Sequence, residues 1–223
     1  MNILVIGSTD NLDECRAKFG ETHHYRHELE QQGAEKNFTQ CDVVFDFNIH
    51  LDPSQMEVYR DHPRVTAFLN SSYISLQQLA LEVNHQIKAS LFGFCGLPTF
   101  LNRSAIEVSL YQDGDQDRLI NVLGQLQTDF EIVRDRVGLV TPRIISMIIN
   151  EAYYTVQEGT ASREDIDLGM KLGTNYPFGP FEWAKRIGIK NVYNLLVAIY
   201  DDTKDERYKI CPLLKYESLQ VVS

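Results

Sequence analysis

The feature that most constrains the fold is a change of pattern near residue 135. Before it, short β-rich runs alternate with segments whose apolar residues recur at helical spacing, and from Pro142 onward no run has strand character. The strand-like runs are NILVIG, DVVFDFN, RVTAFLN, ASLFGFCG, AIEVSLYQ and FEIVRD, and the helix-like ones are NLDECRAKF, SLQQLALEV and DQDRLINVLGQLQ. Such alternation is typical of a mostly parallel sheet covered by helices. We therefore predict an α/β domain over residues 1–134, followed by an all-helical domain over residues 135–223.

The second part of the chain has the pattern of four helices. Apolar side chains recur every three or four residues over 144–156, which gives the first helix a broad apolar face. Gly159 is placed to stop that helix, and Ser162 with Asp165 forms a capping box for the next. Gly173 is expected to end the second helix, and two more follow in PFEWAKR and NVYNLLVAIYDD. A unit this small with so apolar a first helix predicts burial against another domain or a second copy, so we expect a homodimer formed through the helical domain.

Composition and charge exclude several classes of protein. The chain has 223 residues, is 43% hydrophobic and carries a formal charge of −10, with 10 basic and 19 acidic side chains in residues 1–134. This excess of acid argues against nucleic acid as a partner. No run has the length of a membrane helix and no signal peptide is evident, so we expect a cytoplasmic protein that does not span a membrane. The cysteines are far apart without a CxxC pair, which predicts reduced thiols rather than zinc ligands or disulfides: Cys15, Cys41, Cys95 and Cys211.

The opening MNILVIGSTDNL resembles the strand, turn and helix with which a dinucleotide-binding unit begins. Such a loop needs glycines for the turn, for backbone approach to the pyrophosphate and for close helix packing. Here Gly7 fills the first place, Thr9 the second and Leu12 the third. A carboxylate about twenty residues on would accept the ribose hydroxyls, and Glu28 or Glu30 occupies that place, unless each is simply a solvated charge. The pattern predicts the architecture of a nucleotide site with an impaired phosphate loop.

Two clusters of polar residues were considered as metal sites. His23, His24 and His27 lie close in sequence, but no fourth ligand accompanies them, and a polar strand edge explains them better. The acidic run DGDQD over residues 113–117 has no surrounding loop that would converge oxygens on an ion, so a solvated turn leading into a helix is the favoured interpretation. We predict no metal site.

The helical part carries a recognisable motif. The stretch from Asp135 to Gly188 resembles the C-terminal domain of the 3-hydroxyacyl-CoA dehydrogenases, in the order and spacing of Gly138, Arg143, NEA at 150–152, Gly159, EDID at 164–167 and YPFGPFEW at 176–183. ERYKICPLLK at 206–215 is similar to the tail of some members. The resemblance implies NAD as cofactor and an acyl-CoA as ligand. The chain is most similar to the second half of double-length members, in which a reduced Rossmann-like unit accompanies the helical domain.

The first part resembles the Rossmann domain of the same family but is shorter. CDVVFDF at 41–47 is similar to the family strand that reads as an aspartate, apolar residues and a glutamate. Only 33 residues separate Gly7 from Cys41. The family normally has a second βα unit and a helical hairpin there, and the hairpin contributes to the CoA site, so the shorter segment implies a reduced Rossmann-like domain with fewer ligand contacts.

The same resemblance assigns the catalytic positions. LNSSYISLQQLA is similar to the family stretch that bears the catalytic serine, which falls at Ser72, with Asn70 before it near the cofactor. SLFGFCGLPTFLNRSAIEVSL matches the stretch with the catalytic histidine and glutamate; Cys95 stands at the histidine position and Glu107 keeps the glutamate. The family asparagine is replaced by Pro142.

These replacements remove chemistry. A positioned acid or base contributes roughly 10² to 10⁴ in rate, and a thiol with an ordinary pKa near 8.5 is a poor substitute for an imidazole. Proline has no amide to donate. Cys95 is predicted to be a small buried side chain or, if activated, a nucleophile.

The sequence is therefore consistent with two functions. One is an NAD-dependent 3-hydroxyacyl-CoA dehydrogenase acting on short substrates such as 3-hydroxybutyryl-CoA, with impaired catalysis. The other is a non-catalytic dimerisation scaffold or accessory subunit of a full-length dehydrogenase.

Overall fold

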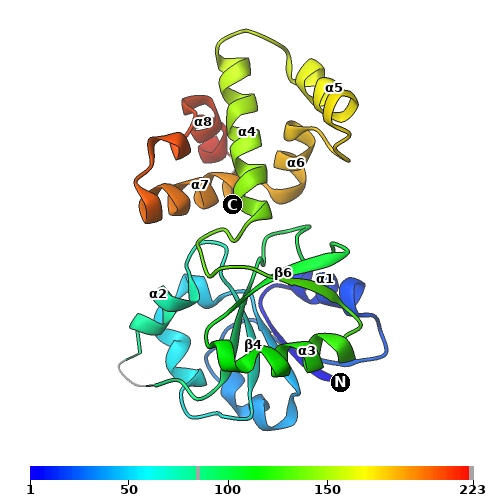
Figure 1. The fold of residues 1–223 in the computed structure, drawn as a ribbon, viewed down its shortest axis with the longest axis vertical. Coiled ribbons are helices and arrows are strands. Elements are labelled where there is room, and N and C mark those ends of the chain that lie inside the picture. Colours follow the sequence, from blue (N-terminus) through cyan, green and yellow to red (C-terminus); the bar gives the residue numbers. More distant parts are fainter. Residues whose placement is uncertain (84–85, 221–223) are drawn as a thin grey trace. The chain divides into compact units, whose positions relative to one another are not determined.

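A computed structural model describes residues 1–83 and 86–220. The chain divides into two compact units. Met1–Gly96 with Phe100–Leu139 form what we call the sheet unit, and Leu97–Thr99 with Val140–Ser223 form the helical unit. Figure 1 shows both, coloured along the sequence.

The sheet unit is built on a seven-stranded sheet with the order β2-β1-β3-β4-β5-β6-β7. Its strands are β1 (Asn2–Ile6), β2 (His24–Glu28), β3 (Val43–Asp46), β4 (Thr66–Asn70), β5 (Ser90–Phe94), β6 (Ala105–Leu110) and β7 (Asp129–Ile132). Every neighbouring pair is parallel except β5 and β6, which are antiparallel. The predicted α/β domain with a mostly parallel sheet is confirmed.

Both faces of the sheet are buried, each by its own set of helices. Alternate residues of β1 point to opposite faces, so Ile3 and Val5 enter one core while Leu4 and Ile6 enter the other. The first core is closed by α1 (Thr9–Phe19) and α3 (Gln116–Gln125). The second is closed by the 3₁₀ helices η1 (Ala34–Gln40) and η3 (Pro53–Tyr59) and by α2 (Leu76–Leu81). The short 3₁₀ turns η2 (Ile49–Leu51) and η4 (Asp113–Asp115) complete the unit.

Strand β2 is not among the strand-like runs of the sequence, but the polar strand edge predicted at His23, His24 and His27 is confirmed there. Its sequence HYRHE lacks apolar alternation, and it becomes a strand by pairing in parallel with β1 at the edge of the sheet. The histidines therefore have structural partners: His23 Nδ1 lies 3.1 Å from the terminal amine of Met1, and His27 Nε2 lies 2.8 Å from the Gly7 carbonyl oxygen. Over residues 1–83 and 86–220, no three His, Cys, Asp or Glu side chains are grouped so that they could hold a metal ion.

The helical unit confirms the predicted all-helical fold. Its helices are α4 (Thr141–Gln157), α5 (Arg163–Thr174), α6 (Pro180–Ile187), α7 (Ile189–Thr203) and α8 (Pro212–Gln220), with a 3₁₀ turn η5 (Glu206–Tyr208) before α8. Gly159 follows α4 with φ of +72°, as predicted. The Ser162 side chain caps α5 by accepting from the Asp165 N–H, which is the first half of the predicted capping box, whereas the Asp165 carboxylate accepts from the Ser162 hydroxyl. The expected stop at Gly173 is wrong. Helix α5 runs one residue further, and Asn175 ends it with φ of +55°, because asparagine tolerates the left-handed conformation nearly as well as glycine.

Asn150 fastens the C-terminal segment to α4. Its side-chain oxygen accepts from the Cys211 N–H at 2.9 Å, and its amide nitrogen donates to the Lys209 carbonyl at 2.9 Å. The side chain is 3% exposed, so it satisfies two backbone groups away from water. The NEA motif and the ERYKICPLLK tail thus meet in space.

Asp167 caps helix α6 from across the α5–α6 turn. Its carboxylate accepts from the N–H groups of Phe181 at 2.8 Å and Glu182 at 3.2 Å, at the positive end of the helix dipole. A Cβ on Gly179 would lie 2.3 Å from this carboxylate, so glycine is required there. This contact explains the spacing between EDID and YPFGPFEW.

The helices of the described residues include none that is long and apolar enough to cross a membrane. The four cysteines, which all lie in the described residues, form no disulfide, and Cys15, Cys95 and Cys211 are buried.

Candidate functional site

Open α/β sheets bind ligands beyond the carboxyl ends of their parallel strands, and we call this border of the sheet its carboxyl edge. Four of the residues singled out in the sequence lie at this edge. Gly7 follows β1, Asn70 ends β4, Ser72 comes two residues later, and Cys95 follows β5. Strands β1, β3, β4 and β5 are mutually parallel neighbours, so these positions gather at one end of the sheet.

Asn70 holds three strand ends together. Its side-chain oxygen accepts from the N–H of Gly96 beyond β5 at 3.0 Å and from the N–H of Ser72 at 3.2 Å. Its amide nitrogen donates to the Phe47 carbonyl beyond β3 at 3.0 Å. Because backbone donors meet the oxygen and a backbone acceptor meets the nitrogen, the orientation of the amide is fixed. Asn70 is 2% exposed and acts as a structural hub of the site.

Ser72 and Cys95 are in contact. The Ser72 hydroxyl lies 2.6 Å from the Asn70 side-chain oxygen and 3.4 Å from the Cys95 sulfur. A hydroxyl has one proton, so the Ser72 hydroxyl can donate either to the Asn70 oxygen or to the Cys95 sulfur, and the shorter contact favours the Asn70 oxygen. The structure therefore brings together three residues that the resemblance assigned to the site. They are all buried.

Sequence reasoning missed an imidazole beside this cluster. His50, in η2 after β3, places its Nδ1 atom 3.3 Å from the amide nitrogen of Asn70, and its ring centroid lies 4.9 Å from that of Tyr73. Burial lowers the His50 pKa more than the nearby Phe47 carbonyl raises it. The neutral ring is also the form that can accept the Asn70 N–H. Nothing in the sequence signals this contact, because twenty residues separate His50 from Asn70.

Glu107 lies on the strand next to Cys95. Strands β5 and β6 pair antiparallel with Phe94 opposite Val108. Continuing that register by one residue sets Cys95 opposite Glu107, the relation that the resemblance assigns to the histidine and glutamate of the family. Glu107 is half-buried. Burial raises the pKa of the Tyr73 phenol, with a further contribution from Cys95.

Pro142 has a structural role in the helical unit. It occupies the first turn of α4 and is buried. Proline suits that position, because a first-turn residue has no partner for its N–H and needs the φ angle that the ring imposes. At the place of the family asparagine, the chain thus has a helix-starting residue without an amide.

The loop after β1 is closed by its own side chains. Ser8 and Asn11 form a capping box at the start of α1. The Asn11 side-chain oxygen accepts from the Ser8 N–H at 2.9 Å, and the Ser8 hydroxyl accepts from the Asn11 N–H at 3.3 Å. Asp10 adds a negative charge in the first turn. A Cβ on Gly7 would lie 2.6 Å from the Asn11 oxygen, so the asparagine side chain sits directly over the glycine.

Glu28 is also engaged. It ends β2, and the Gly7 N–H donates to its backbone carbonyl at 2.9 Å. Its carboxylate accepts from the Asn37 amide at 2.8 Å and faces Lys36 Nζ at 3.7 Å.

These residues do not fit the pyrophosphate of a dinucleotide. A phosphate at a helix N-terminus needs free N–H groups and the positive end of the dipole. Here the Ser8 and Asn11 N–H groups have partners, and Asp10 already compensates the dipole. An anion would meet a carboxylate at the start of α1. Glu28, which is placed to accept the ribose hydroxyls, is tied to η1.

Asp46 is a buried carboxyl group at the same edge. It accepts hydrogen bonds from the Tyr59 hydroxyl at 2.9 Å, the Asn48 N–H at 2.9 Å and the Gln31 amide at 3.0 Å. Burial raises its pKa to about 6, although these hydrogen bonds act in the opposite direction. Asp46 holds the turn after β3 that carries His50.

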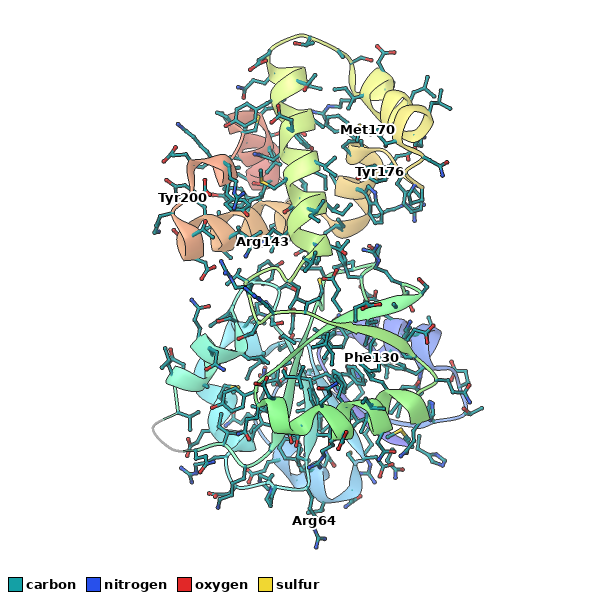
Figure 2. All side chains as sticks on the ribbon, viewed as in Figure 1. Arg64, Phe130, Arg143, Met170, Tyr176 and Tyr200 are labelled. Atoms are coloured by element: carbon teal, nitrogen blue, oxygen red, sulfur yellow. The ribbon has the colours of Figure 1, made fainter. Side chains whose placement is uncertain are left out.

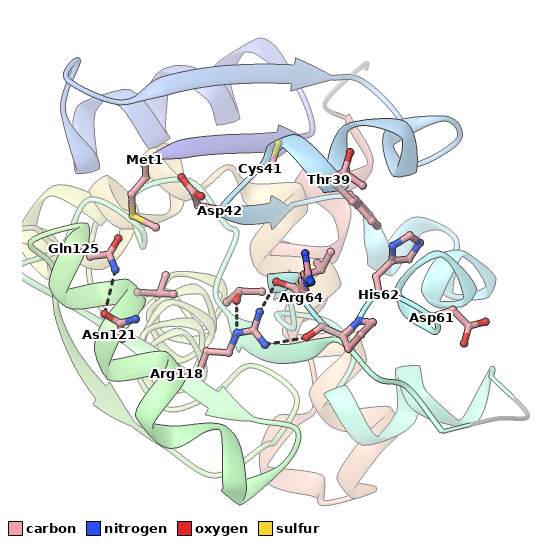
Figure 3. Close-up of a pocket in the computed structure, with 15 residues that line it drawn as sticks. Met1, Thr39, Cys41, Asp42, Asp61, His62, Arg64, Arg118, Asn121 and Gln125 are labelled. Atoms are coloured by element: carbon pink, nitrogen blue, oxygen red, sulfur yellow. Dashed lines mark hydrogen bonds between the residues drawn. The ribbon is translucent and has the colours of Figure 1, made fainter.

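A cavity of about 600 Å³ lies at the opposite edge of the sheet (Figure 3). It is lined by residues that precede strands, including Met1, Asp42 and Val65. The Arg118 guanidinium spans it, donating from Nε to the Thr66 hydroxyl at 2.7 Å and from Nη1 to the Pro63 carbonyl at 3.1 Å. Arg118 belongs to α3, so these hydrogen bonds connect α3 to the start of β4. The cavity thus lies at the edge where such sheets do not bind ligands.

Comparison with known proteins decides the family. The chain is 38% identical to a probable 3-hydroxybutyryl-CoA dehydrogenase of Deinococcus radiodurans over 189 residues, which are 81% of this chain and 67% of that protein. The chain belongs to the 3-hydroxyacyl-CoA dehydrogenase family. Residues 138–217 match the family described as "3-hydroxyacyl-CoA dehydrogenase, C-terminal domain". The resemblance stated from the motifs is confirmed.

Several other relatives are matched over part of their length. A 3-hydroxybutyryl-CoA dehydrogenase of Bradyrhizobium diazoefficiens is 25% identical over 180 residues, which are 78% of this chain and 61% of that protein. The 3-hydroxyadipyl-CoA dehydrogenase of Escherichia coli is 40% identical over 87 residues, which are 39% of this chain and 18% of that protein. The chain thus spans less than two thirds of the length of these family members.

Solved structures show the same fold. The (S)-3-hydroxybutyryl-CoA dehydrogenase of Ralstonia eutropha superposes with a TM-score of 0.70 at 19% identity, covering 96% of this chain and 92% of that one. A longer 3-hydroxybutyryl-CoA dehydrogenase of Escherichia coli gives a TM-score of 0.59 at 27% identity, covering 69% of this chain and 32% of that one.

Proposed function

We propose that this chain is a 3-hydroxyacyl-CoA dehydrogenase homologue that does not itself transfer hydride and acts as a dimerising scaffold or accessory subunit. The observation that carries the proposal is the start of α1, where the side chains of Ser8 and Asn11 take N–H groups that a pyrophosphate would use and Asp10 adds a negative charge in the first turn. Without a bound nicotinamide there is no hydride acceptor.

The catalytic positions support the same proposal. Cys95 offers a thiol in place of the imidazole that would serve as general base. Pro142 supplies no amide. The site keeps the positions of the family serine and glutamate at Ser72 and Glu107, but the two groups that would take a proton and orient the substrate are replaced.

The helical unit supports a role in association. None of the residues of α5 is buried, and Leu168 and Leu172 on this helix are 53% and 78% exposed. A helix with an apolar side that the unit itself does not cover is suited to pack against a second copy. We expect a homodimer by sedimentation velocity, and Leu172→Arg should shift it toward monomer. Glu164→Arg, a change of charge at another exposed position of α5, is the control.

The proposal is tested by calorimetry with NADH and by a spectrophotometric assay with acetoacetyl-CoA. We expect no turnover, and no NADH binding in the sheet unit. Restoring the family base with Cys95→His should not create activity, because the dinucleotide site is closed. Micromolar NADH binding in the sheet unit together with turnover would refute the proposal.

The second candidate is the family activity itself, an NAD-dependent dehydrogenase of short 3-hydroxyacyl-CoA substrates. It is favoured by the identity to the Deinococcus protein, which extends well beyond the helical domain. The same two assays distinguish the candidates. Co-purification with a full-length homologue tests the accessory role, and a homodimer that ignores such a chain would argue against it.

A further inference from the structure

A surface cavity of about 570 Å³ lies on the helical unit, between the end of α5, the turn that follows and α6. Figure 2 shows Met170 and Tyr176 on this part of the unit. The cavity is lined by Lys171, Pro177, Phe178, Glu182, Lys185 and Arg186. Its volume lies within the range of small-molecule sites. Three of the six lining side chains are cations and one is an anion.

The single anion is already used within the structure. Glu182 Oε1 lies 2.7 Å from Lys171 Nζ, and its second oxygen accepts from the Gly179 N–H at 3.0 Å. These contacts lower the pKa of Glu182. They also hold the Lys171 ammonium in place at the cavity. The charges of Lys171 and Glu182 cancel, so the net positive charge of the cavity lining comes from Lys185 and Arg186.

Neither of these two cations is in an ion pair in the described part of the chain, although the charge of Arg186 also acts on Glu182 and helps to lower its pKa. Over the described residues, no hydrogen bond or ion pair engages the side chain of Lys185 or Arg186, although acidic residues outnumber basic ones by ten in the chain. The Arg186 guanidinium instead stacks 3.8 Å from the centroid of the Phe178 ring. Stacking uses the face of the guanidinium and leaves its in-plane N–H groups to bind an oxyanion.

The Phe178 ring on which Arg186 stacks is itself packed against another aromatic ring. The Phe178 ring packs edge-on against Trp183, with centroids 5.1 Å apart. A planar fork of donors held on an aromatic stack, next to a lysine, matches the oxygens of a phosphate group. Pro177 and the Phe178 ring add apolar surface beside it, suited to a ring system.

We infer that this cavity binds a small phosphate-bearing ligand of the nucleotide class, with Arg186 and Lys185 on the phosphate. The inference goes beyond the proposed function and stands without it, because it concerns the helical unit alone.

The test is titration of the full chain with ADP, coenzyme A, inorganic phosphate and adenosine, followed by calorimetry and by tryptophan fluorescence. Trp183 is the only tryptophan of the chain, and it touches the ring on which Arg186 stacks. We expect saturable binding of ADP or coenzyme A that changes this fluorescence and weakens with salt, and weaker binding of phosphate. Adenosine should not bind. Binding of coenzyme A but not of ADP would show that the site also contacts groups of coenzyme A outside its ADP part.

Variants of Lys185 and Arg186 distinguish a specific binding site from nonspecific attraction by positive charge. Lys185→Ala with Arg186→Ala should weaken binding by about tenfold or more for each cation removed. Arg186→Lys keeps the charge but loses the stacked fork, so it should also weaken binding. The control is Lys209→Ala with Lys215→Ala, which removes the same charge from exposed positions outside the cavity and should leave the affinity within about twofold. An absence of saturable binding would overturn the inference, as would equal losses in the two double variants.

The same variants keep this inference separate from the proposed function. Binding of NADH that disappears in the Lys185 and Arg186 variant belongs to this cavity. Binding that persists in that variant belongs elsewhere and counts against the closed dinucleotide site.

Discussion

The buried carboxyl group of Asp46 leads to a prediction about stability and pH. Asp46 is fully buried, and burial raises its pKa from 3.8 to about 6. In the unfolded chain it ionises at its ordinary value, so between these two values the folded state binds more protons than the unfolded state. The contribution of Asp46 to stability is therefore complete below pH 3.8 and is lost as the pH rises toward 6. A shift of about two units corresponds to about 3 kcal/mol.

The substitution Asp46→Asn removes the ionisable group, and the asparagine side chain can make the same contacts. The side-chain oxygen can still accept from the Asn48 N–H and the Gln31 amide, which both meet Oδ1 of the aspartate. The new amide can donate to the Tyr59 oxygen, whose hydroxyl turns away. The variant cannot ionise, so its stability relative to the wild type should rise by about 3 kcal/mol between about pH 4 and about pH 8.

Hydrogen exchange of peptides covering residues 43–48, with chemical denaturation followed by circular dichroism, provides the measurement. Tryptophan fluorescence is unsuitable because Trp183 lies in the helical unit. Asp52→Asn is the control: Asp52 is exposed, and hydrogen bonds from Ser54 and Gln55 lower its pKa, so that variant should show no such rise. Parallel stability curves for the wild type and the Asp46 variant would refute the reasoning.

Further predictions concern the polar anchors of the helical unit. Asn150→Ala leaves the buried Cys211 N–H and the Lys209 carbonyl without partners and should cost about 2–3 kcal/mol, with faster proteolysis of residues 206–220. Asp167→Ala removes the cap of α6 and should cost about 1–2 kcal/mol in thermal unfolding. Gly179→Ala forces a Cβ into the Asp167 carboxylate and should cost about 1–3 kcal/mol; an unchanged melting temperature would contradict the close approach.

The sequence predicts the parts of the fold that depend on apolar periodicity. Six of the seven strands and the four helices predicted for the second part lie where their patterns indicate, whereas the fifth helix there, α8, was not predicted. Strand β2 lacks apolar alternation, so the sequence indicated it only as a polar strand edge at its histidines, and its pairing with β1 makes it a strand. The end of α5 is misplaced because both Gly173 and Asn175 can end a helix, and local sequence does not decide between them.

The candidate site is less predictable. Asn70, Ser72 and Cys95 come from the resemblance, and the structure adds that a hydrogen-bonded chain joins them. His50 and the buried Asp46 carry no motif, because their roles arise only when the turn after β3 meets the ends of other strands. At the start of α1, the sequence showed only that glycines of the phosphate loop are missing. The structure adds that Ser8 and Asn11 form a capping box there.

The two outermost strands decide how copies of this protein can associate. Strand β2 carries histidine, arginine and glutamate, and strand β7 has charged Asp129 and Glu131 at alternate positions. A neighbouring chain that tried to extend the sheet would have to strip water from these charges and align its own against them. Growth of the sheet into a continuous intermolecular ribbon is thereby opposed at both margins, which leaves self-association to side chains outside the sheet.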